Sequence, residues 1–186
     1  MDGAATGHGF ALFDTAIGRC GIAWGTQGIA AVQLPAHNDR GMRARLLRLV
    51  PAACEAMPPP EVQSVIDGLV ALLRGEAAEL SGVVLDMDRV AAFDRRVYEV
   101  ARTIPPGETL SYGEIALRLG DRGAARDVGQ ALGRNPFAIV VPCHRVVAAG
   151  GRAGGFSARA GVSTKLRLLA IEGAELTRQR GLFERP

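Results

Sequence analysis

The chain has 186 residues, of which 48% are apolar and 22% charged, so it is long enough for one large or two small domains. It contains no apolar run near the roughly 18 residues of a membrane span, and its N-terminus lacks a basic segment followed by an apolar one. We therefore expect neither a membrane span nor a signal peptide, and we expect the protein in the cytoplasm.

The net charge of +3 is unevenly distributed along the chain. Residues 1–88 carry six Lys and Arg against ten Asp and Glu, a net −4, whereas residues 89–186 carry sixteen against nine, a net +7. The second half is therefore the candidate for binding a polyanion. A solvated basic surface with no partner explains the charge equally well.

Short apolar stretches separated by glycine-containing turns begin the chain and are typical of β-strands. They predict a small antiparallel sheet with strands at residues 10–14, 20–24 and 28–34. Residues 82–87 predict one further strand.

Two helices are expected in the same half of the chain. An arginine-bearing segment predicts the first at about residues 39–50, and the proline-rich residues 51–60 predict a loop or linker. The second is an amphipathic helix ended by Gly75, because apolar residues recur at helical spacing: Val62, Val65, Ile66, Leu69, Val70 and Leu73.

Helices predominate after residue 88. Apolar residues at helical spacing from Phe93 to Ile104 mark a helix that the prolines after it stop. Ser111 and Glu114 form a capping box, which predicts the start of a helix that ends at Gly120.

A second short helix is predicted at residues 124–133, after a tight glycine-containing connection at residues 121–123. Two short helices joined in this way on the basic half of a chain indicate a helix-turn-helix. Such pairs also occur as plain packing units in helical domains, so charge and motif order must support the interpretation.

The apolar run at residues 138–141 predicts a buried strand that ends just before Cys143. A glycine-rich loop at residues 150–161 follows. The last predicted helix covers about residues 163–172 and ends at Gly173.

A thiol and an imidazole stand side by side after the apolar run. Cys143 is a strong nucleophile only as a thiolate, so a neighbouring base or cation such as His144 or Arg145 matters. Glu172 lies where the helix dipole disfavours a negative charge and is a candidate to orient the imidazole. A buried structural cysteine and a solvated glutamate remain open alternatives.

The three cysteines, Cys20, Cys54 and Cys143, contain no Cys-x-x-Cys pair, and one must stay unpaired in any disulfide scheme. We expect reduced thiols. With the three histidines they offer six soft ligands, but the spacing is unlike that of a zinc site, so no metal is predicted.

The segments around Cys143 resemble a known family. The string Pro142-Cys143-His144-Arg145-Val146-Val147, preceded by Gly133-Arg134-Asn135-Pro136 and by Ala125-Arg126-Asp127-Val128-Gly129, is similar to the O6-alkylguanine-DNA alkyltransferases, also called methylated-DNA–protein-cysteine methyltransferases. The match spans residues 109–173, and several independent motifs follow the family's order. Residues 1–88 resemble the family only in general layout.

The resemblance implies an α/β (α+β) chain of two domains. Residues 1–88 would form an N-terminal α/β domain, a small antiparallel sheet with helices in a ribonuclease H-like layout. Residues 89–186 would form a mostly helical, winged helix-turn-helix-like domain that holds the DNA-binding surface and the active site.

The resemblance also implies a DNA repair protein that acts as a monomer, rotates O6-alkylguanine out of duplex DNA and takes the alkyl group onto its own cysteine. Cys143 would be the acceptor, His144 would act through a water to hold it as thiolate, and Glu172 would orient the imidazole. Because the thioether formed is stable, each molecule would act once. No S-adenosylmethionine, metal or other cofactor would be needed, since the DNA supplies the alkyl group.

Other residues take roles through the same resemblance. Arg126 matches the arginine that fills the gap left by the flipped base, entering from the minor groove. Tyr112 matches the tyrosine that crowds the neighbouring phosphate and helps to protonate the leaving guanine; without the match it is a half-buried aromatic at a helix start. Asn135 matches the asparagine that braces the turn between the recognition helix and the active-site strand. Arg145 would support either the fold or the DNA backbone.

The glycine-rich loop matches the guanine-binding loop of the family. Ser157 is placed to contact the O6 region, and Phe156 stands where the family often has Tyr, so a hydroxyl contact is lost. Further DNA or substrate contacts are implied for Ala125, Gly129, Arg134 and Val146.

Two other functions fit part of the sequence. A lesion-sensing or regulatory DNA-binding protein would flip alkylguanine without repairing it, but relatives of that kind lack the acceptor cysteine that is present here. A Cys-His-Glu hydrolase accounts for the three reactive groups but not for Arg126, the helix pair or the charge distribution.

Overall fold

Three antiparallel strands form the centre of the N-terminal part of the protein. The computed structural model describes residues 7–154 and 161–174. Strands β1 (Gly9–Thr15), β2 (Gly18–Gly25) and β3 (Gly28–Gln33) are joined by tight turns, and each pairs antiparallel with the next. The three strands and the turns predicted from the glycine pattern are confirmed.

A fourth strand, β4 (Cys54–Glu55), extends the sheet to the order β3-β2-β1-β4. It runs parallel to β1, and its backbone bonds include Cys54 N to His8 O at 3.1 Å. It lies within the segment at residues 51–60 that was expected to be a loop or linker. A two-residue strand is too short to show an alternating pattern, which is why the sequence gives no sign of it.

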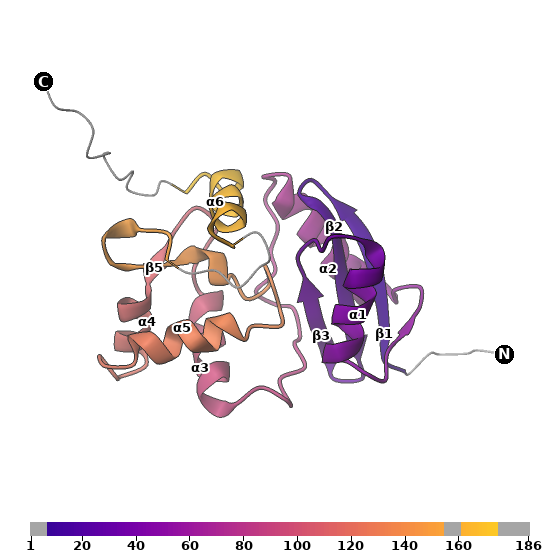
Figure 1. Cartoon of the computed structure of the whole chain (residues 1–186), viewed down its shortest axis with the longest axis horizontal. Coiled ribbons are helices and arrows are strands. Elements are labelled where there is room, and N and C mark those ends of the chain that lie inside the picture. Colours follow the sequence, from indigo (N-terminus) through magenta and orange to yellow (C-terminus); the bar gives the residue numbers. More distant parts are fainter. Residues whose placement is uncertain (1–6, 155–160, 175–186) are drawn as a thin grey trace, which may run out of the picture.

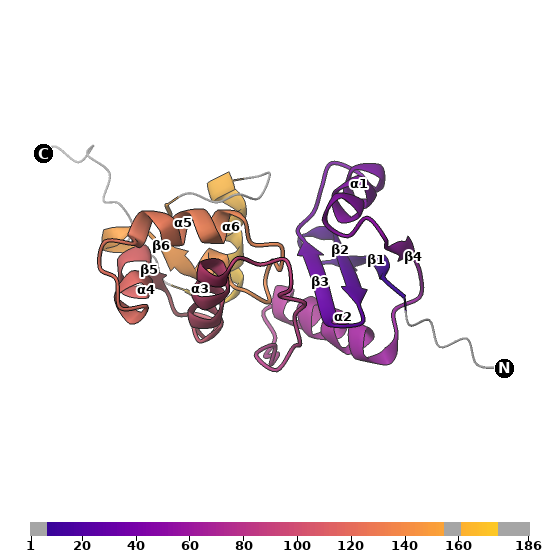
Figure 2. The ribbon, with the colours of Figure 1, turned by 90° about the horizontal axis from the view of Figure 1, so that it is seen from below.

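Helices α1 (Asp39–Leu49) and α2 (Pro60–Leu73) cover opposite faces of the sheet (Figure 2), and both were predicted. Neighbouring strand residues point to opposite faces. Accordingly Ala23 and the other residues on its face of the sheet pack against Met42 and Leu46 of α1. Ile22 and the other residues on the opposite face pack against Leu69 and other apolar residues of α2.

The strand predicted at residues 82–87 is wrong. The segment forms only an isolated bridge between Leu85 and Ile29, with Ile29 N donating to Val84 O at 2.9 Å. The stretch before the bridge is instead bound by a side chain, since Arg102 donates to the carbonyls of Leu80, Ser81 and Val83.

The C-terminal part is mostly helical (Figure 1). It contains α3 (Ala92–Arg102), α4 (Tyr112–Arg118), α5 (Ala125–Gly133) and α6 (Gly161–Ile171), close to the predicted bounds. The capping box at the start of α4 is confirmed: Glu114 N donates to Ser111 Oγ, and Ser111 N to Glu114 Oε2. Strands β5 (Leu110–Ser111) and β6 (Val146–Val147) form a small parallel pair.

The strand predicted at residues 138–141 is also wrong, because the chain makes a tight turn there. Val141 N donates to Phe137 O at 2.9 Å, and Ile139 has a φ of 73°. The apolar side chains serve two different cores. Ile139 and Val140 pack with the sheet and α2, whereas Phe137 and Val141 pack with α3, α4 and α5. A straight strand would not reach both.

The architecture as a whole is mixed α/β, a small sheet and six α-helices within the described residues. No helix in these ranges is both long and apolar enough to cross a bilayer.

The contact between β3 and residues 82–87 leaves no room for a side chain at Gly28, so we expect substitutions there to destabilise the fold. Gly28 has a φ of +121°, and a Cβ there would lie 2.5 Å from the carbonyl oxygen of Val84. Because a backbone atom cannot rotate away, we expect Gly28→Ala to lower the free energy of unfolding by roughly 2 kcal/mol or more in urea denaturation. Gly82→Ala is the control, since a Cβ at Gly82 meets nothing within 4 Å. Equal effects of the two substitutions would contradict this account of the contact.

Candidate active site

Cys143 begins a short 3-10 turn, η1 (Cys143–Arg145), directly after the tight turn at residues 137–141. It is a free, half-buried cysteine. Burial raises the pKa of its thiol, and this outweighs the hydrogen bond from Asn135 and the charge of Lys165, which lower it. The thiol is therefore protonated near neutral pH and needs a base before it can act as a nucleophile.

Asn135 braces the turn that leads to Cys143. It lies just beyond the end of α5, where its Nδ2 donates to Val141 O and its Oδ1 accepts from Phe137 N, both at 2.9 Å. The same side chain lowers the pKa of the Cys143 thiol. The structure thus places Asn135 where the resemblance expected a brace, although it braces a turn rather than a strand.

His144 and Glu172 form a buried pair. His144 Nε2 lies 2.9 Å from Glu172 Oε1, and the two side chains are 1% and 2% exposed. Burial lowers the pKa of His144 more than Glu172 raises it, so the imidazole is neutral. A carboxylate only accepts hydrogen bonds, so Nε2 carries the proton. Nδ1 is then a bare lone pair, and it has no hydrogen-bond partner within the described residues.

Arg145, itself buried, also binds Glu172. Its Nε and Nη2 donate to the two carboxylate oxygens at 2.9 and 2.8 Å, and its Nη1 donates to the carbonyl of Ile104. Of the two roles left open for Arg145, support of the fold is therefore the one observed. Burial disfavours the charge of Glu172, but the hydrogen bonds from His144 and Arg145 prevail and lower its pKa to about 2.

Lys165 is a site residue that the sequence reasoning missed. It is fully buried on α6, donates to Val146 O and lies 5.7 Å from the centre of the Tyr112 ring. Burial lowers its pKa to about 8, although Cys143 raises it. Its position in the sequence could have indicated burial, because at helical spacing Lys165 falls on the same face of α6 as Leu168 and Leu169.

Tyr112, at the start of α4, is held closely on two sides. Its ring lies against Gly129 of α5, and a Cβ on Gly154 would approach the ring and hydroxyl to 3.1 and 3.2 Å. Burial, and secondarily the neighbouring Cys143, raise the pKa of the phenol, which therefore stays protonated.

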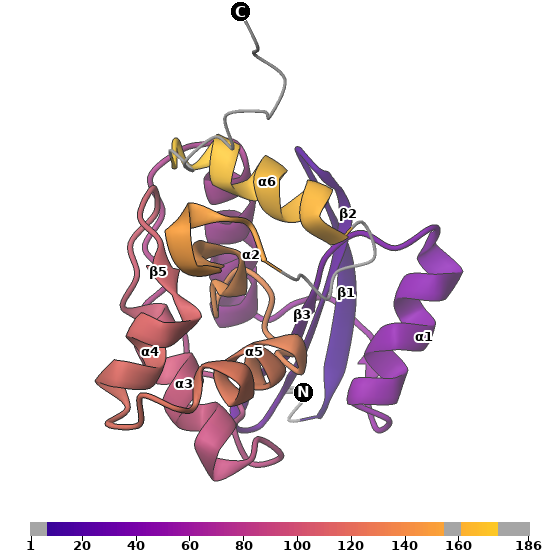
Figure 3. The ribbon, with the colours of Figure 1, turned by 60° about the vertical axis from the view of Figure 1, so that its left-hand side comes forward.

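The predicted catalytic residues thus come together: Cys143 and Tyr112 pack against the same helical core, Asn135 braces the turn before Cys143, and its neighbour His144 pairs with Glu172. They come from α4, the segment between α5 and β6, and the end of α6, which packs on η1 (Figure 3). Within the described ranges no group of His, Cys, Asp or Glu side chains is arranged to hold a metal ion.

The predicted DNA-contact residues are more dispersed. Arg126 is exposed at the start of α5 and makes no hydrogen bond or ion pair with the described residues. Arg134 directly follows α5 and pairs with Asp94. Ala125 is half-buried, and Val146 is fully buried in the helical core. Phe156 and Ser157 lie outside the described residues.

Comparisons with known proteins agree on one family. Residues 92–174 match the family model described as 6-O-methylguanine DNA methyltransferase, DNA binding domain. A methylated-DNA–protein-cysteine methyltransferase of Methanothermobacter thermautotrophicus is 36% identical over 159 residues, which cover 86% of this chain and 82% of that protein. The protein of that name from Mycobacterium tuberculosis is 40% identical over 159 residues, covering 84% and 94%. The crystal structure of M. tuberculosis OGT in complex with DNA matches with a TM-score of 0.72 at 35% identity, covering 88% and 92%.

The buried carboxylate predicts a pH-dependent stability. Because the pKa of Glu172 is about 2 in the folded protein against an ordinary 4.5, its charge stabilises the fold above about pH 4.5, and this contribution is lost as the pH falls toward 2. We expect Glu172→Gln to lower the free energy of unfolding by roughly 3 kcal/mol at neutral pH, measured by urea denaturation. The difference from wild type should shrink across that acid range.

The control is Glu108→Gln, which neutralises an exposed carboxyl with no side-chain hydrogen bond within the described residues. A difference between wild type and Glu172→Gln that stays constant from pH 7 to pH 2 would contradict the assigned ion pairs.

Proposed function

This chain belongs to the methylated-DNA–protein-cysteine methyltransferase family, and we propose that it repairs O6-alkylguanine, chiefly O6-methylguanine, in duplex DNA by moving the alkyl group onto Cys143. The observation that carries the proposal is the setting of Cys143, a half-buried thiol beside the Asn135 brace and a buried His144–Glu172 pair. Because a thioether is not readily cleaved, each molecule reacts once.

The transfer is a direct displacement at the alkyl carbon. His144 Nδ1 accepts the proton of the Cys143 thiol through a bridging water, and the thiolate then attacks the carbon. The S–C bond forms as the C–O6 bond breaks, and the electron pair of that bond passes to the guanine. Tyr112 donates a proton to the departing guanine and is reprotonated by the imidazolium of His144. The net result is an S-alkyl cysteine and an unmodified guanine, with no cofactor consumed.

Arg145 keeps His144 available as the base. A histidine facing a lone carboxylate is stabilised as imidazolium, which has no lone pair to accept a proton. Here Arg145 already neutralises Glu172, and its charge lowers the pKa of His144. Glu172 therefore orients the imidazole without charging it.

The helix pair α4 and α5 serves as the DNA-binding unit. We infer a winged helix-turn-helix arrangement in which α5 is the recognition helix and the β5–β6 pair flanks it, within a domain of residues 89–186. The net charge of +7 on that half supports binding to a polyanion. Arg126, exposed and without a protein partner in the described residues, fills the space left by the flipped base.

Residues 1–88 form the second inferred domain. A sheet with α1 and α2 on opposite faces supports the ribonuclease H-like layout. The proposed protein acts as a monomer in the cytoplasm, where cysteines stay reduced.

The contacts to the flipped base rest on the family match. Phe156 and Ser157 would contact the guanine, and Ala125, Gly129 and Arg134 would contribute to the DNA and substrate surface. The side chain of Val146 is buried, so this residue could take part only through its backbone. Gly129 also supports the Tyr112 ring, and Val146 supplies the carbonyl that binds Lys165. Both residues therefore shape the site even where they do not touch the DNA.

Alkyl transfer is tested directly with a duplex oligonucleotide that contains one O6-methylguanine. We expect one methyl group per protein, found by mass spectrometry on the peptide that contains Cys143, and none on the exposed Cys54. Cys143→Ala should abolish transfer but retain binding, whereas Cys54→Ser should react like wild type. Tight binding with an unmodified Cys143 would instead favour a protein that senses the lesion.

Base flipping is tested with Arg126→Ala. Unstacking a base costs a few kcal/mol, so loss of the filling side chain should slow transfer from duplex DNA by about tenfold or more at saturating DNA. Transfer from free O6-methylguanine base should not change. Arg122→Ala is the control, because it removes the same charge from the connection before α5. Duplex transfer by Arg126→Ala at the wild-type rate would exclude the filling role.

A further inference from the structure

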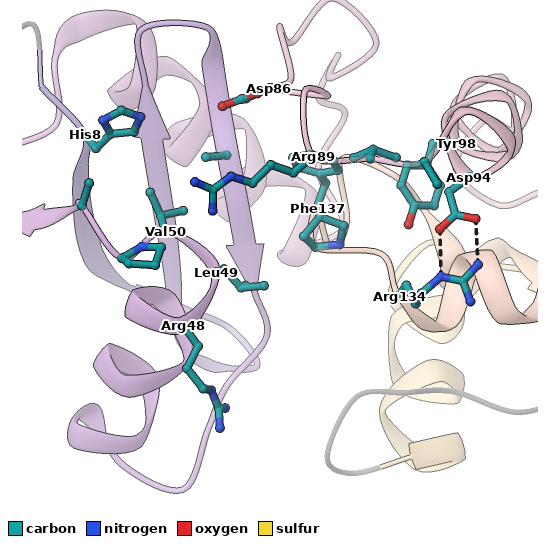
Figure 4. Close-up of a pocket in the computed structure, with 16 residues that line it drawn as sticks. His8, Arg48, Leu49, Val50, Asp86, Arg89, Asp94, Tyr98, Arg134 and Phe137 are labelled. Atoms are coloured by element: carbon teal, nitrogen blue, oxygen red, sulfur yellow. Dashed lines mark hydrogen bonds and ion pairs between the residues drawn. The ribbon is translucent and has the colours of Figure 1, made fainter.

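An ion pair with two parallel hydrogen bonds joins α3 to the end of α5. Arg134 Nε and Nη2 donate to the two carboxylate oxygens of Asp94 at 2.9 and 2.8 Å (Figure 4). Asp94 is only 5% exposed, whereas the Arg134 side chain is 57% exposed and stays in contact with water. The pair lies on the wall of a cleft of about 430 Å³ between the end of α1 and α3. Neither the mechanism nor the expected DNA contacts account for a buried acid at this place.

A second residue of α3 supports the same turn. Tyr98 is buried one helical turn after Asp94, and its hydroxyl donates to Ala131 O at 2.9 Å. Its ring packs edge-on against Phe137, with ring centres 6.3 Å apart. The two α3 side chains therefore hold both the last turn of α5 and the segment that follows it.

The residue after Arg134 connects this support to the reactive thiol. Asn135 donates to Val141 O and accepts from Phe137 N at 2.9 Å each, which fixes the turn before Cys143, and it lowers the pKa of the Cys143 thiol. A hydrogen bond depends steeply on distance and angle, so a small displacement of the α5 terminus weakens these two bonds and shifts Asn135 relative to Cys143. The donor stabilises the thiolate against the cost of burial.

We propose that Asp94 is a positioning residue, which holds Arg134 and thereby keeps the Asn135 amide in place in the turn that carries Cys143. Its part in alkyl transfer rests on the proposed function, but its effect on the thiol does not. The competing interpretation is that the ion pair only docks α3 onto α5. The two differ in what happens to Cys143 when the pair is removed.

The test is the rate at which iodoacetamide alkylates Cys143 between pH 7 and 9, followed by mass spectrometry of its peptide. If Asp94→Asn displaces Asn135, the thiolate loses a donor and alkylation slows at each pH, by up to about tenfold, which corresponds to a rise of about one unit in the pKa. If the ion pair only docks the helices, loosening exposes Cys143 to water, which favours the thiolate and speeds alkylation. The direction of the change therefore separates the two interpretations.

The chain contains a matched control. Arg43 and Glu55 form the same two-bond geometry, at 2.8 and 2.9 Å, between α1 and β4. Glu55→Gln removes this pair and should leave the alkylation rate of Cys143 unchanged. A slowing by Glu55→Gln equal to that by Asp94→Asn would overturn the proposal.

Two further variants keep the result interpretable. Asp94→Asn/Arg134→Gln leaves no unpaired buried charge, so it should fold and should slow alkylation as much as Asp94→Asn alone. Asn135→Ala should slow alkylation of Cys143 at least as much as Asp94→Asn does. The double variant Asp94→Asn/Asn135→Ala should react no more slowly than Asn135→Ala alone. Wild-type or faster alkylation by the Asp94 variants, or effects of Asp94→Asn and Asn135→Ala that add, would overturn the positioning role.

The outcome is independent of repair. Iodoacetamide needs neither DNA nor alkylguanine, so slowed alkylation in the variants supports the positioning role even if wild-type protein fails to take a methyl group from DNA. That failure would count against the proposed function alone.

Discussion

The structure depends on one buried carboxylate. Glu172 follows α6 at a point where the helix dipole opposes its charge, and it keeps that charge because Arg145 and His144 both donate to it. Arg145 also binds the carbonyl of Ile104 just beyond α3, so one ionic cluster joins α6, η1 and the end of α3. Loss of the carboxylate would leave a buried guanidinium without a partner. The groups that prepare the nucleophile are therefore also the groups that hold the helices together.

The turn before Cys143 has a comparable double role. Its apolar side chains fill the core beneath the sheet and the core between the helices, so the position of Cys143 depends on both. The β-branched Ile139 adopts a positive φ, which is unfavourable for such a residue and is held in place by its burial against the sheet and α2. The N-terminal part thus contributes to the site through packing rather than through a side chain at the reaction.

Local patterns in the sequence were enough to predict the three main strands, the helices, the capping box of α4 and the candidate nucleophile. They failed where a distant partner decides the conformation. The run at residues 138–141 is apolar enough for a strand. Which of its side chains enters which of the two cores depends on the tertiary structure and cannot be read from the run itself. Residues 82–87 bridge to β3 only at Leu85, and the distant Arg102 binds the carbonyl of Val83. The partners of Arg145, Lys165 and Asp94 lie far along the chain, and no spacing rule identifies them.

The close support of Tyr112 has a consequence for how the substrate range of this protein could be changed. Gly154 lies against the ring on one side, and Lys165 of α6 lies over it. The chain on both sides of residues 155–160 is thus anchored to the same aromatic, whatever those six residues are. A library of variants randomised over residues 155–160 could therefore be screened for acceptance of other alkyl groups while the catalytic residues stay unchanged.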